Sequence, residues 1–175
     1  LEFPIREIIE YDGLILFATE DGVERFNETS FSWESTWTPG NGLPNNMGDW
    51  VGELWTDGTH LVVGSATFAG WGGFQRGVVG HLDGSTGTWS TFNTGQNGVP
   101  NGYPLSMSHC GSYLYIGLFN NNGGVTYMDL NSSSVQGSFT TSVLSNGQVA
   151  AVACDTADTL YVGYDATNQG ISKYD

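Results

Sequence analysis

A cluster of aromatic residues within Ser65–Arg76 is the part of this sequence best suited to contact another molecule. The segment holds Phe68, Trp71 and Phe74, and it ends at Arg76, one of only four Lys or Arg residues in the chain. Glycines flank Trp71, so these side chains lie on a backbone that adapts easily. Aromatic rings in such a segment stack on sugar rings or anchor a peptide. The alternative is that they fold back as a lid on the domain beneath them.

Amide and carboxylate side chains form a second candidate set for binding. The set contains three consecutive asparagines and four residues of a Gly/Pro-rich stretch: Asn120, Asn121, Asn122, Asn41, Asn45, Asn46 and Asp49. Side chains of these types supply the donors and acceptors that recognition of a neutral sugar needs. Asn beside Gly is also a common turn residue, so turn formation explains much of the same pattern.

The sequence shows no catalytic or metal-binding motif. No two of His60, His81 and His109 have the spacing of metal ligands, and no Asp-x-Asp-x-Asp calcium loop occurs. A carboxylate pair for glycoside hydrolysis needs proximity in space rather than in sequence, and nothing here points to one. We therefore expect a protein without enzymatic activity, cofactor or metal, and a polysaccharide-active enzyme domain is the alternative.

The two cysteines, Cys110 and Cys154, lie at nearly equivalent places in two neighbouring repeats that are described below. Two cysteines of a secreted chain can pair. A disulfide requires Cα atoms within about 7 Å of each other. The sequence alone leaves open whether the two are bonded.

Composition restricts the partners and the compartment. The formal net charge is -14, from 18 acidic residues against four basic ones. Nucleic acids and anionic membrane surfaces bind through basic residues, so neither is an expected partner. No stretch approaches the roughly 20 apolar residues of a membrane span. Loops rich in Asn, Ser, Thr and Gly with almost no Lys favour a secreted or cell-surface protein, and a chain beginning at Leu1 is expected to be a mature or excised segment.

Four short apolar segments repeat along the chain, and each ends in a small residue. They are Leu14–Ala18, Leu61–Gly64, Leu114–Gly117 and Leu160–Gly163. A turn precedes each segment, and another short apolar run precedes each turn. This pattern predicts a β-hairpin in every repeat, whose strands we call A and B.

A third strand, C, follows in every repeat and ends in Asp or Asn. The four are Gly22–Asn27, Val78–Asp83, Gly124–Asp129 and Gly170–Asp175. A more polar strand D then carries spaced large residues: Trp33, Trp37, Trp89, Phe92, Val135 and Phe139. The small residues closing strand B are 46, 53 and 46 positions apart, which is the spacing of propeller blades. The sequence therefore predicts an all-β protein, a β-propeller with about four blades of four antiparallel strands.

The predicted propeller occupies the whole chain, residues 1–175. Its blades cover about 5–46, 47–102, 103–148 and 149–175, and residues 1–4 are available to complete the last blade. A fragment of a larger ring, a half-ring and a closed four-bladed ring all fit this count.

Three motifs of the first repeat carry a resemblance to a known group of repeats. They read Gly22-Val23-Glu24-Arg25-Phe26-Asn27, Trp33-Glu34-Ser35-Thr36-Trp37 and Asn41-Gly42-Leu43-Pro44-Asn45-Asn46. They resemble the propeller repeats of two-component regulator sensor domains and of large secreted proteins of marine microbes. The resemblance implies the propeller fold over essentially the whole chain and says little about function. The sequence departs from the kelch and WD patterns and lacks the Asp-box of sialidases.

The B–C and D–A connections of a propeller emerge on one face, and that face usually holds the ligand site. The candidate residues Asp49, Phe68, Trp71, Phe74, Arg76, Asn120, Asn121 and Asn122 all fall in such connections. The sequence therefore predicts a propeller module that binds a glycan or a protein on its B–C/D–A face. A structural repeat within a surface or adhesive assembly is the further alternative.

An open half-ring is expected to associate with other copies through its ends, because an unpaired strand edge offers free backbone donors and acceptors. The edges concerned are strand A of the first blade and the strand that ends at Tyr174. Multi-angle light scattering is expected to show a dimer or a larger oligomer. A stable monomer, or a structure in which Leu1–Phe3 closes a four-bladed ring, would contradict this expectation.

Overall fold

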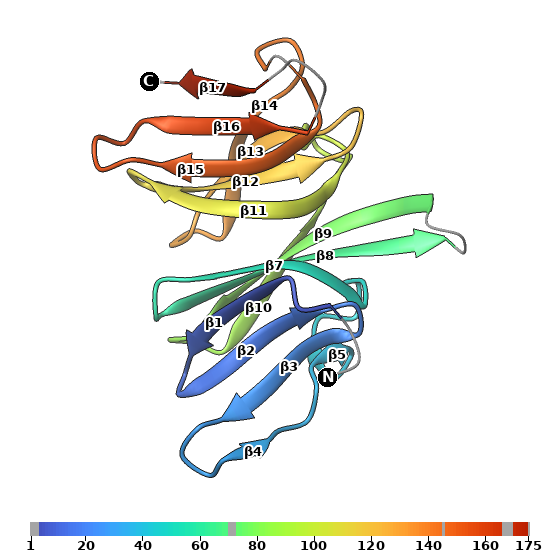
Figure 1. The fold of residues 1–175 in the computed structure, drawn as a ribbon, viewed down its shortest axis with the longest axis vertical. Helices are drawn as coiled ribbons and strands as arrows, with labels where there is room; N and C mark the ends of the chain where they lie inside the picture. Colours follow the sequence, from blue (N-terminus) through green and yellow to red (C-terminus); the bar gives the residue numbers. More distant parts are fainter. Residues whose placement is uncertain (1–3, 70–72, 145, 166–169, 175) are drawn as a thin grey trace. The chain divides into compact units, whose positions relative to one another are not determined.

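The computed structural model describes residues 4–69, 73–144, 146–165 and 170–174, and they form an all-β structure (Figure 1). Within these ranges the regular elements are β-strands joined by turns, as predicted. No helix in the part of the chain described here is long and apolar enough to cross a membrane. The chain divides into two compact units, Leu1–Phe92 and Asn93–Asp175, which we call unit 1 and unit 2.

Unit 1 is built on two four-stranded antiparallel sheets. The first has the order β1-β2-β3-β4, with strands β1 (Glu7–Tyr11), β2 (Leu14–Thr19), β3 (Gly22–Asn27) and β4 (Ser32–Trp33). The second has the order β10-β9-β8-β7, with strands β7 (Trp50–Thr56), β8 (His60–Ala69), β9 (Gly73–Asp83) and β10 (Thr88–Asn93). A short parallel pair, β5 (Thr38–Pro39) and β6 (Gly42–Leu43), lies in the connection between them.

Unit 2 repeats this plan. Its first sheet has the order β11-β12-β13-β14, with strands β11 (Tyr103–Cys110), β12 (Tyr113–Phe119), β13 (Gly124–Asp129) and β14 (Ser134–Phe139). Its second sheet has three strands among the described residues: β15 (Val149–Cys154), β16 (Leu160–Tyr164) and β17 (Ile171–Tyr174). The sequential meander of antiparallel strands is the arrangement of a propeller blade. The blade boundaries expected from the sequence stay a prediction, as does closure of the last blade, because Leu1–Phe3 lie outside the described residues.

One prediction from the sequence is wrong: Ser65–Arg76 is not a loop. Strands β8 and β9 continue through this segment as a hairpin that extends past the rest of its sheet, with Ala66 opposite Gly77 and Phe68 opposite Phe74 (Figure 1). Pairing in this way satisfies backbone groups that a free loop would leave to water. Trp71 lies outside the described residues.

The core of unit 1 follows the two-residue period of its strands. Leu16 and Ala18 of β2 are fully buried, whereas Phe17 between them points to the other face and is half-buried. The buried residues form one cluster with those of the second sheet: Tyr11, Leu16, Ala18, Val23, Leu43, Met47, Val51, Leu54, Leu61, Val63 and Val78. Strand β7 lies in contact with both β1 and β2, so the apolar faces of the two sheets meet along this line.

Unit 2 holds its two sheets together with both apolar and polar contacts. Val149, Val152 and Val162 belong to its buried cluster. The Ser106 hydroxyl of β11 donates to the Val152 carbonyl oxygen (3.3 Å) and accepts from the Val152 amide (3.1 Å). The Ser108 hydroxyl accepts from the amide of Cys154 (3.0 Å). These serines satisfy backbone groups where the first strands of the two sheets lie side by side.

A close backbone approach fixes the segment that leads into β7. A Cβ added at Gly48 would overlap the carbonyl oxygen and carbon of Ala66, so only glycine fits there. The Gly48 amide donates to the buried Ser65 hydroxyl (3.1 Å), which donates in turn to the carbonyl oxygen of Val78 (3.3 Å). This contact presses the chain just before Asp49 onto β8.

We expect Gly48→Ala to destabilise unit 1 by about 1–3 kcal/mol, the range for overpacking a filled interior. Gly163→Ala is the matched control, because a Cβ there would meet nothing closer than 3.5 Å. Urea denaturation of both variants measures the difference. Equal free energies of unfolding for the two variants would contradict this expectation. They would show that the segment around Gly48 can move away from β8 without lowering stability.

Candidate functional site

A cleft of about 310 Å³ lies at one end of the line where the two sheets of unit 1 meet. It is lined by seven residues: Glu20, Asp21, Asp49, Trp50, Ala66, Thr67 and Phe68. The first two come from the β2–β3 turn, the next two from the start of β7, and the last three from β8. We call it the acidic cleft. Two connections of the propeller type, B–C and D–A, therefore meet there.

Arg6 contacts two of the residues that line the acidic cleft, Glu20 and Trp50. Its amide donates to the Ala18 carbonyl oxygen (3.0 Å), which continues the β1–β2 pairing and fixes the residue opposite the end of β2. The Arg6 Nη2 atom lies 2.8 Å from Glu20 Oε1. The same guanidinium carbon lies 4.6 Å from the centre of the Trp50 ring, within cation–π range. One guanidinium thus binds a carboxylate and an aromatic ring of the cleft together.

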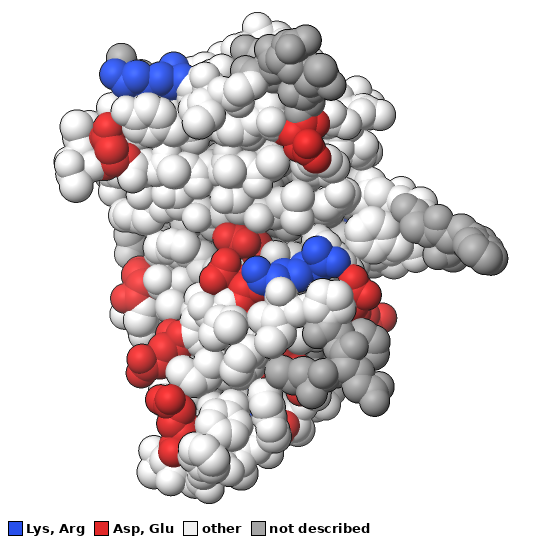
Figure 2. Space-filling model, in the orientation of Figure 1, with Lys and Arg blue, Asp and Glu red and all other residues white. Residues whose placement is uncertain are grey.

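The other two carboxylates of the acidic cleft have no such partner. Asp21 and Asp49 are exposed, and within the described ranges neither carboxylate forms a hydrogen bond or an ion pair. Of the 18 acidic residues in the sequence, 13 lie in residues 1–92, together with three of the four basic ones. Figure 2 shows acidic side chains on both sides of a basic one over unit 1, near the start of β1. Three carboxylates face one cation, so the acidic cleft carries a net negative charge.

A row of aromatic rings crosses the second sheet beside these carboxylates. The Trp50 and Phe68 rings meet edge to face with centres 5.5 Å apart. Phe68 in turn meets Phe74 at 6.2 Å, again edge to face. All three side chains are half-buried, so each keeps part of its ring accessible. Trp50 and Phe68 thus give the acidic cleft an apolar surface beside its carboxylates, and Phe74 continues the row outside the cleft lining.

Arg76 has a structural contact in this region. Its Nη2 atom donates to the Asn46 carbonyl oxygen at 2.7 Å. The Asn46 side chain donates to the Thr91 hydroxyl at 2.9 Å. Arg76 therefore ties the connection before β7 to β9, and so supports the placement of Asp49.

The candidates from the sequence have different places in the structure. Asp49 and Phe68 line the acidic cleft, Phe74 extends its aromatic wall, and Arg76 supports the connection beside it. Trp71 lies outside the described residues. Whether any of these side chains binds a ligand stays a prediction.

The three consecutive asparagines of the second candidate set lie in unit 2, after β12. The Asn120 carbonyl oxygen accepts from the Gly123 amide at 2.8 Å, which closes a turn. Asn121 Oδ1 accepts from the Gln148 side chain at 2.8 Å. Asn122 is exposed. Turn formation accounts for Asn120, and a side-chain contact engages Asn121, so Asn122 is the one best placed for a ligand.

Sequence reasoning did not select four residues of the site: Arg6, Glu20, Asp21 and Trp50. They come from three segments that only the packing of the sheets brings together. Two signals were present, because Glu20-Asp21 fills a B–C turn and Trp50 directly follows Asp49.

A second cleft of about 270 Å³ is lined by residues of the β1–β2, β7–β8 and β9–β10 turns, where β2 and β8 begin. Its lining includes Tyr11 and Asp12. The nearby Asp57 accepts from the amides of Thr59 (2.9 Å) and His60 (2.7 Å) and pairs with His60 Nδ1 (2.9 Å). Burial raises the pKa of Asp57, but these hydrogen bonds outweigh it and lower the pKa to about 2. Asp57 thus serves the β7–β8 turn and does not line the second cleft. Among the lining residues Tyr11 is the one aromatic side chain and Asp12 the one carboxylate, so the second cleft is the weaker candidate.

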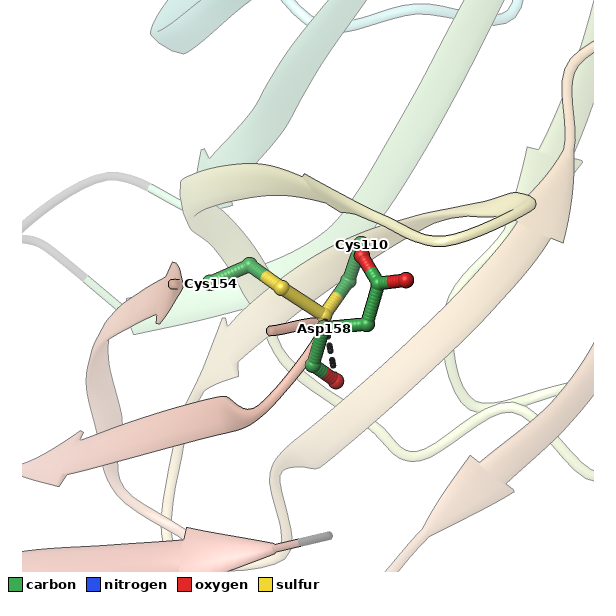
Figure 3. A group of neighbouring side chains, drawn as sticks. All are labelled: Cys110, Cys154 and Asp158. Atoms are coloured by element: carbon green, nitrogen blue, oxygen red, sulfur yellow. Dashed lines mark hydrogen bonds between the residues drawn. A yellow bond between two sulfur atoms is a disulfide. The ribbon is translucent and has the colours of Figure 1, made fainter. Parts of the chain in front are cut away.

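Cys110 and Cys154 form a disulfide in unit 2, with Cα atoms 5.5 Å apart (Figure 3). The bond joins the end of β11 to the end of β15. Asp158 lies beside it: its carbonyl oxygen is 3.3 Å from Cys110 Sγ, and its carboxylate accepts from the Gly111 amide at 2.9 Å. The three side chains are grouped closely enough to hold a metal ion. Bonded sulfur atoms are not thiolates, so in this form the group is a cross-link rather than a metal site.

Solved structures with the same fold were found by comparison. The extracellular domain of the hybrid two-component system BT4673 of B. thetaiotaomicron matches with a TM-score of 0.68 at 17% identity, over 99% of this chain and 20% of that chain. The corresponding domain of BT3049 matches with a TM-score of 0.65 at 20% identity, over 96% and 23%. The WD40 β-propeller domain of Doa1 matches with a TM-score of 0.65 at 12% identity, over 98% and 50%. No family model and no curated protein matches the sequence.

These matches confirm the predicted β-propeller fold and its likeness to the propellers of two-component systems. The chain spans about a fifth of the two extracellular domains. At identities below 25% the likeness is one of fold. The likeness to secreted proteins of marine microbes stays a prediction.

Replacing both cysteines, Cys110→Ala with Cys154→Ala, is expected to lower the free energy of unfolding of unit 2 by about 2–4 kcal/mol, because the unfolded chain regains the freedom of a closed loop. The cysteines are 44 positions apart in sequence. Guanidinium denaturation followed by tyrosine fluorescence measures the change. An unchanged midpoint would mean that the serine contacts between β11 and β15 hold the unit without the cross-link.

Proposed function

We propose that this chain is a non-enzymatic module of an extracellular β-propeller, and that it binds a saccharide in the acidic cleft of unit 1. The observation that carries the proposal is the meeting of Trp50 and Phe68 with Glu20, Asp21 and Asp49 around one cleft. Aromatic faces pack on the C–H face of a sugar ring, and carboxylates accept hydrogen bonds from its hydroxyl groups. Both kinds of group stand on paired strands or tight turns, so they are held in place before a ligand arrives.

The size of the acidic cleft supports a small ligand. Its volume of about 310 Å³ is at the lower end of the range for ligand sites, which begins near 300 Å³. One or two sugar rings are the appropriate scale for such a site. The hairpin of β8 and β9 extends beyond the cleft and offers Phe74 to a longer chain.

A binding role is favoured over hydrolysis by the exposure of the carboxylates. A glycosidase needs one carboxyl group that stays protonated, and enzymes obtain it by burial in an apolar pocket. Asp21 and Asp49 are exposed, and Glu20 is paired with Arg6. The chemistry of the cleft therefore suits recognition of hydroxyl groups better than proton transfer.

An extracellular location is supported by two observations. Disulfides persist mainly in oxidising compartments, and unit 2 has one between Cys110 and Cys154. The fold matches those of two extracellular domains of bacterial two-component systems.

A structural role in an assembly is the second candidate, and the first sheet of unit 1 favours it. Phe31 is 83% exposed and has a positive φ of 55°, a conformation that costs a bulky residue energy. Ile8 and Trp33 are also exposed. Large apolar side chains exposed together mark contact surfaces between proteins. Self-association through such surfaces stays a proposal.

A glycan array followed by calorimetry tests saccharide binding. Trp50→Ala is expected to weaken binding by roughly 1–3 kcal/mol, the cost of removing an aromatic anchor. Trp33→Ala is the matched control, because Trp33 is an exposed tryptophan of the same unit that does not line the cleft.

Asp49→Ala gives a second test if Trp50→Ala does not fold, since Asp49 is exposed and its carboxylate forms no hydrogen bond or ion pair with a described residue. It is expected to weaken binding without changing the melting temperature. The proposal fails if no saccharide on the array binds, or if binding survives both cleft variants at full strength.

A further inference from the structure

We infer that the acidic cleft selects a saccharide carrying a protonated amine over its neutral counterpart. The inference rests on the proposed function and specifies the ligand class of the same site. Four observations on unit 1 carry it: the contacts of Arg6, the unpaired carboxylates, their absence from the described groups that could hold a metal ion, and the aromatic side chains beside them.

Arg6 shows which kind of group the cleft wall accepts. Its guanidinium lies 2.8 Å from a Glu20 oxygen and 4.6 Å from the centre of the Trp50 ring. A carboxylate and an indole on the same side of a cleft together form a receptor for an organic cation. In this structure the Arg6 guanidinium occupies the position between Glu20 and Trp50.

The rest of the cleft rim is left without a cation. Asp21 and Asp49 line the same cleft as Glu20, and within the described ranges no side chain neutralises them. Carboxylates that line the same cleft repel each other. Together they also give the cleft a negative electrostatic potential, which attracts a cationic ligand. A bound ammonium group relieves that repulsion, whereas a neutral sugar leaves it in place and an anionic sugar increases it.

The spacing of the carboxylates favours an organic cation over a metal ion. Among the described residues, a single group of three potential ligands lies within 4.8 Å of one another, and it is Cys110, Cys154 and Asp158 of unit 2. The carboxylates of the acidic cleft are therefore too far apart for one ion to bridge all three. A sugar ring bearing an ammonium group is larger than a metal ion, so it can pack on one aromatic ring of the cleft while its ammonium group lies near the carboxylates.

The test compares two ligands with the same backbone. Chitosan tetramer carries amines, and chitin tetramer carries neutral acetamides at the same positions. Calorimetry in low salt with EDTA, at a pH below the pKa of the amine, is expected to show about tenfold tighter binding of chitosan to the intact chain. Exposed charge pairs and cation–π contacts of ordinary strength add up to such a factor.

The variant Asp21→Asn with Asp49→Asn removes the two charges and keeps the shape of both side chains. It is expected to weaken chitosan binding much more than chitin binding, so that the tenfold preference falls to about twofold or less. The control is Glu28→Gln with Glu34→Gln, which makes the same change in net charge at two exposed residues outside the cleft. The control is expected to keep the preference.

The outcomes separate this inference from the proposed function. Equal binding of chitin and chitosan, with both lost in Trp50→Ala, would overturn the amine preference and leave saccharide binding intact. Failure of every saccharide to bind would overturn the proposed function as well. A preference lost equally in the control pair would reflect overall charge and overturn the inference. So would binding that appears only when calcium replaces EDTA, or tighter binding of a lysine-rich peptide through Asp21 and Asp49.

Discussion

The burial of β2 against β7 and β8 is the contact on which the rest of unit 1 depends. Leu16 and Ala18 of β2 share one fully buried cluster with Leu61 and Val63 of β8. Burying side chains of this size contributes roughly 1.5–3 kcal/mol for each large one, more than any exposed ion pair in the unit contributes. The acidic cleft lies where this packing ends, so the same contact that stabilises the unit also brings the β2–β3 turn to the start of β7.

Two further constraints turn that junction into a site with a fixed geometry. The lack of a side chain at Gly48 lets the chain approach β8, and the buried hydroxyl of Ser65 holds it there. Arg76 fixes the same connection from β9 through the carbonyl oxygen of Asn46. Asp49 and Trp50 follow directly, so these backbone contacts help to fix both residues, and Trp50 is held further by its contacts with Arg6 and Phe68. A ligand site built this way pays little entropy on binding, because its rim is already ordered.

The sequence predicted a strand well where apolar and polar residues alternate with a period of two and turn residues follow the segment. Leu14–Ala18 and Gly124–Asp129 are strands in the structure with nearly those bounds. It failed at Ser65–Arg76, because the Gly-rich tip suggested a loop while the residues on both sides pair as strands. It found Asp49 and missed Glu20, since a site made from distant segments leaves no motif in the sequence. Only the packing of the sheets brings such segments together.

We propose that this propeller module meets its ligand at the acidic cleft of unit 1. Two-dimensional ¹H–¹⁵N NMR of the labelled chain, titrated with the best saccharide from the array, tests it most directly. We expect the largest chemical-shift changes at the backbone amides of the residues that line this cleft: Glu20, Asp21, Asp49, Trp50 and Phe68. Changes concentrated instead at the second cleft, around Asp12 and Thr59, or spread evenly over the chain would contradict it.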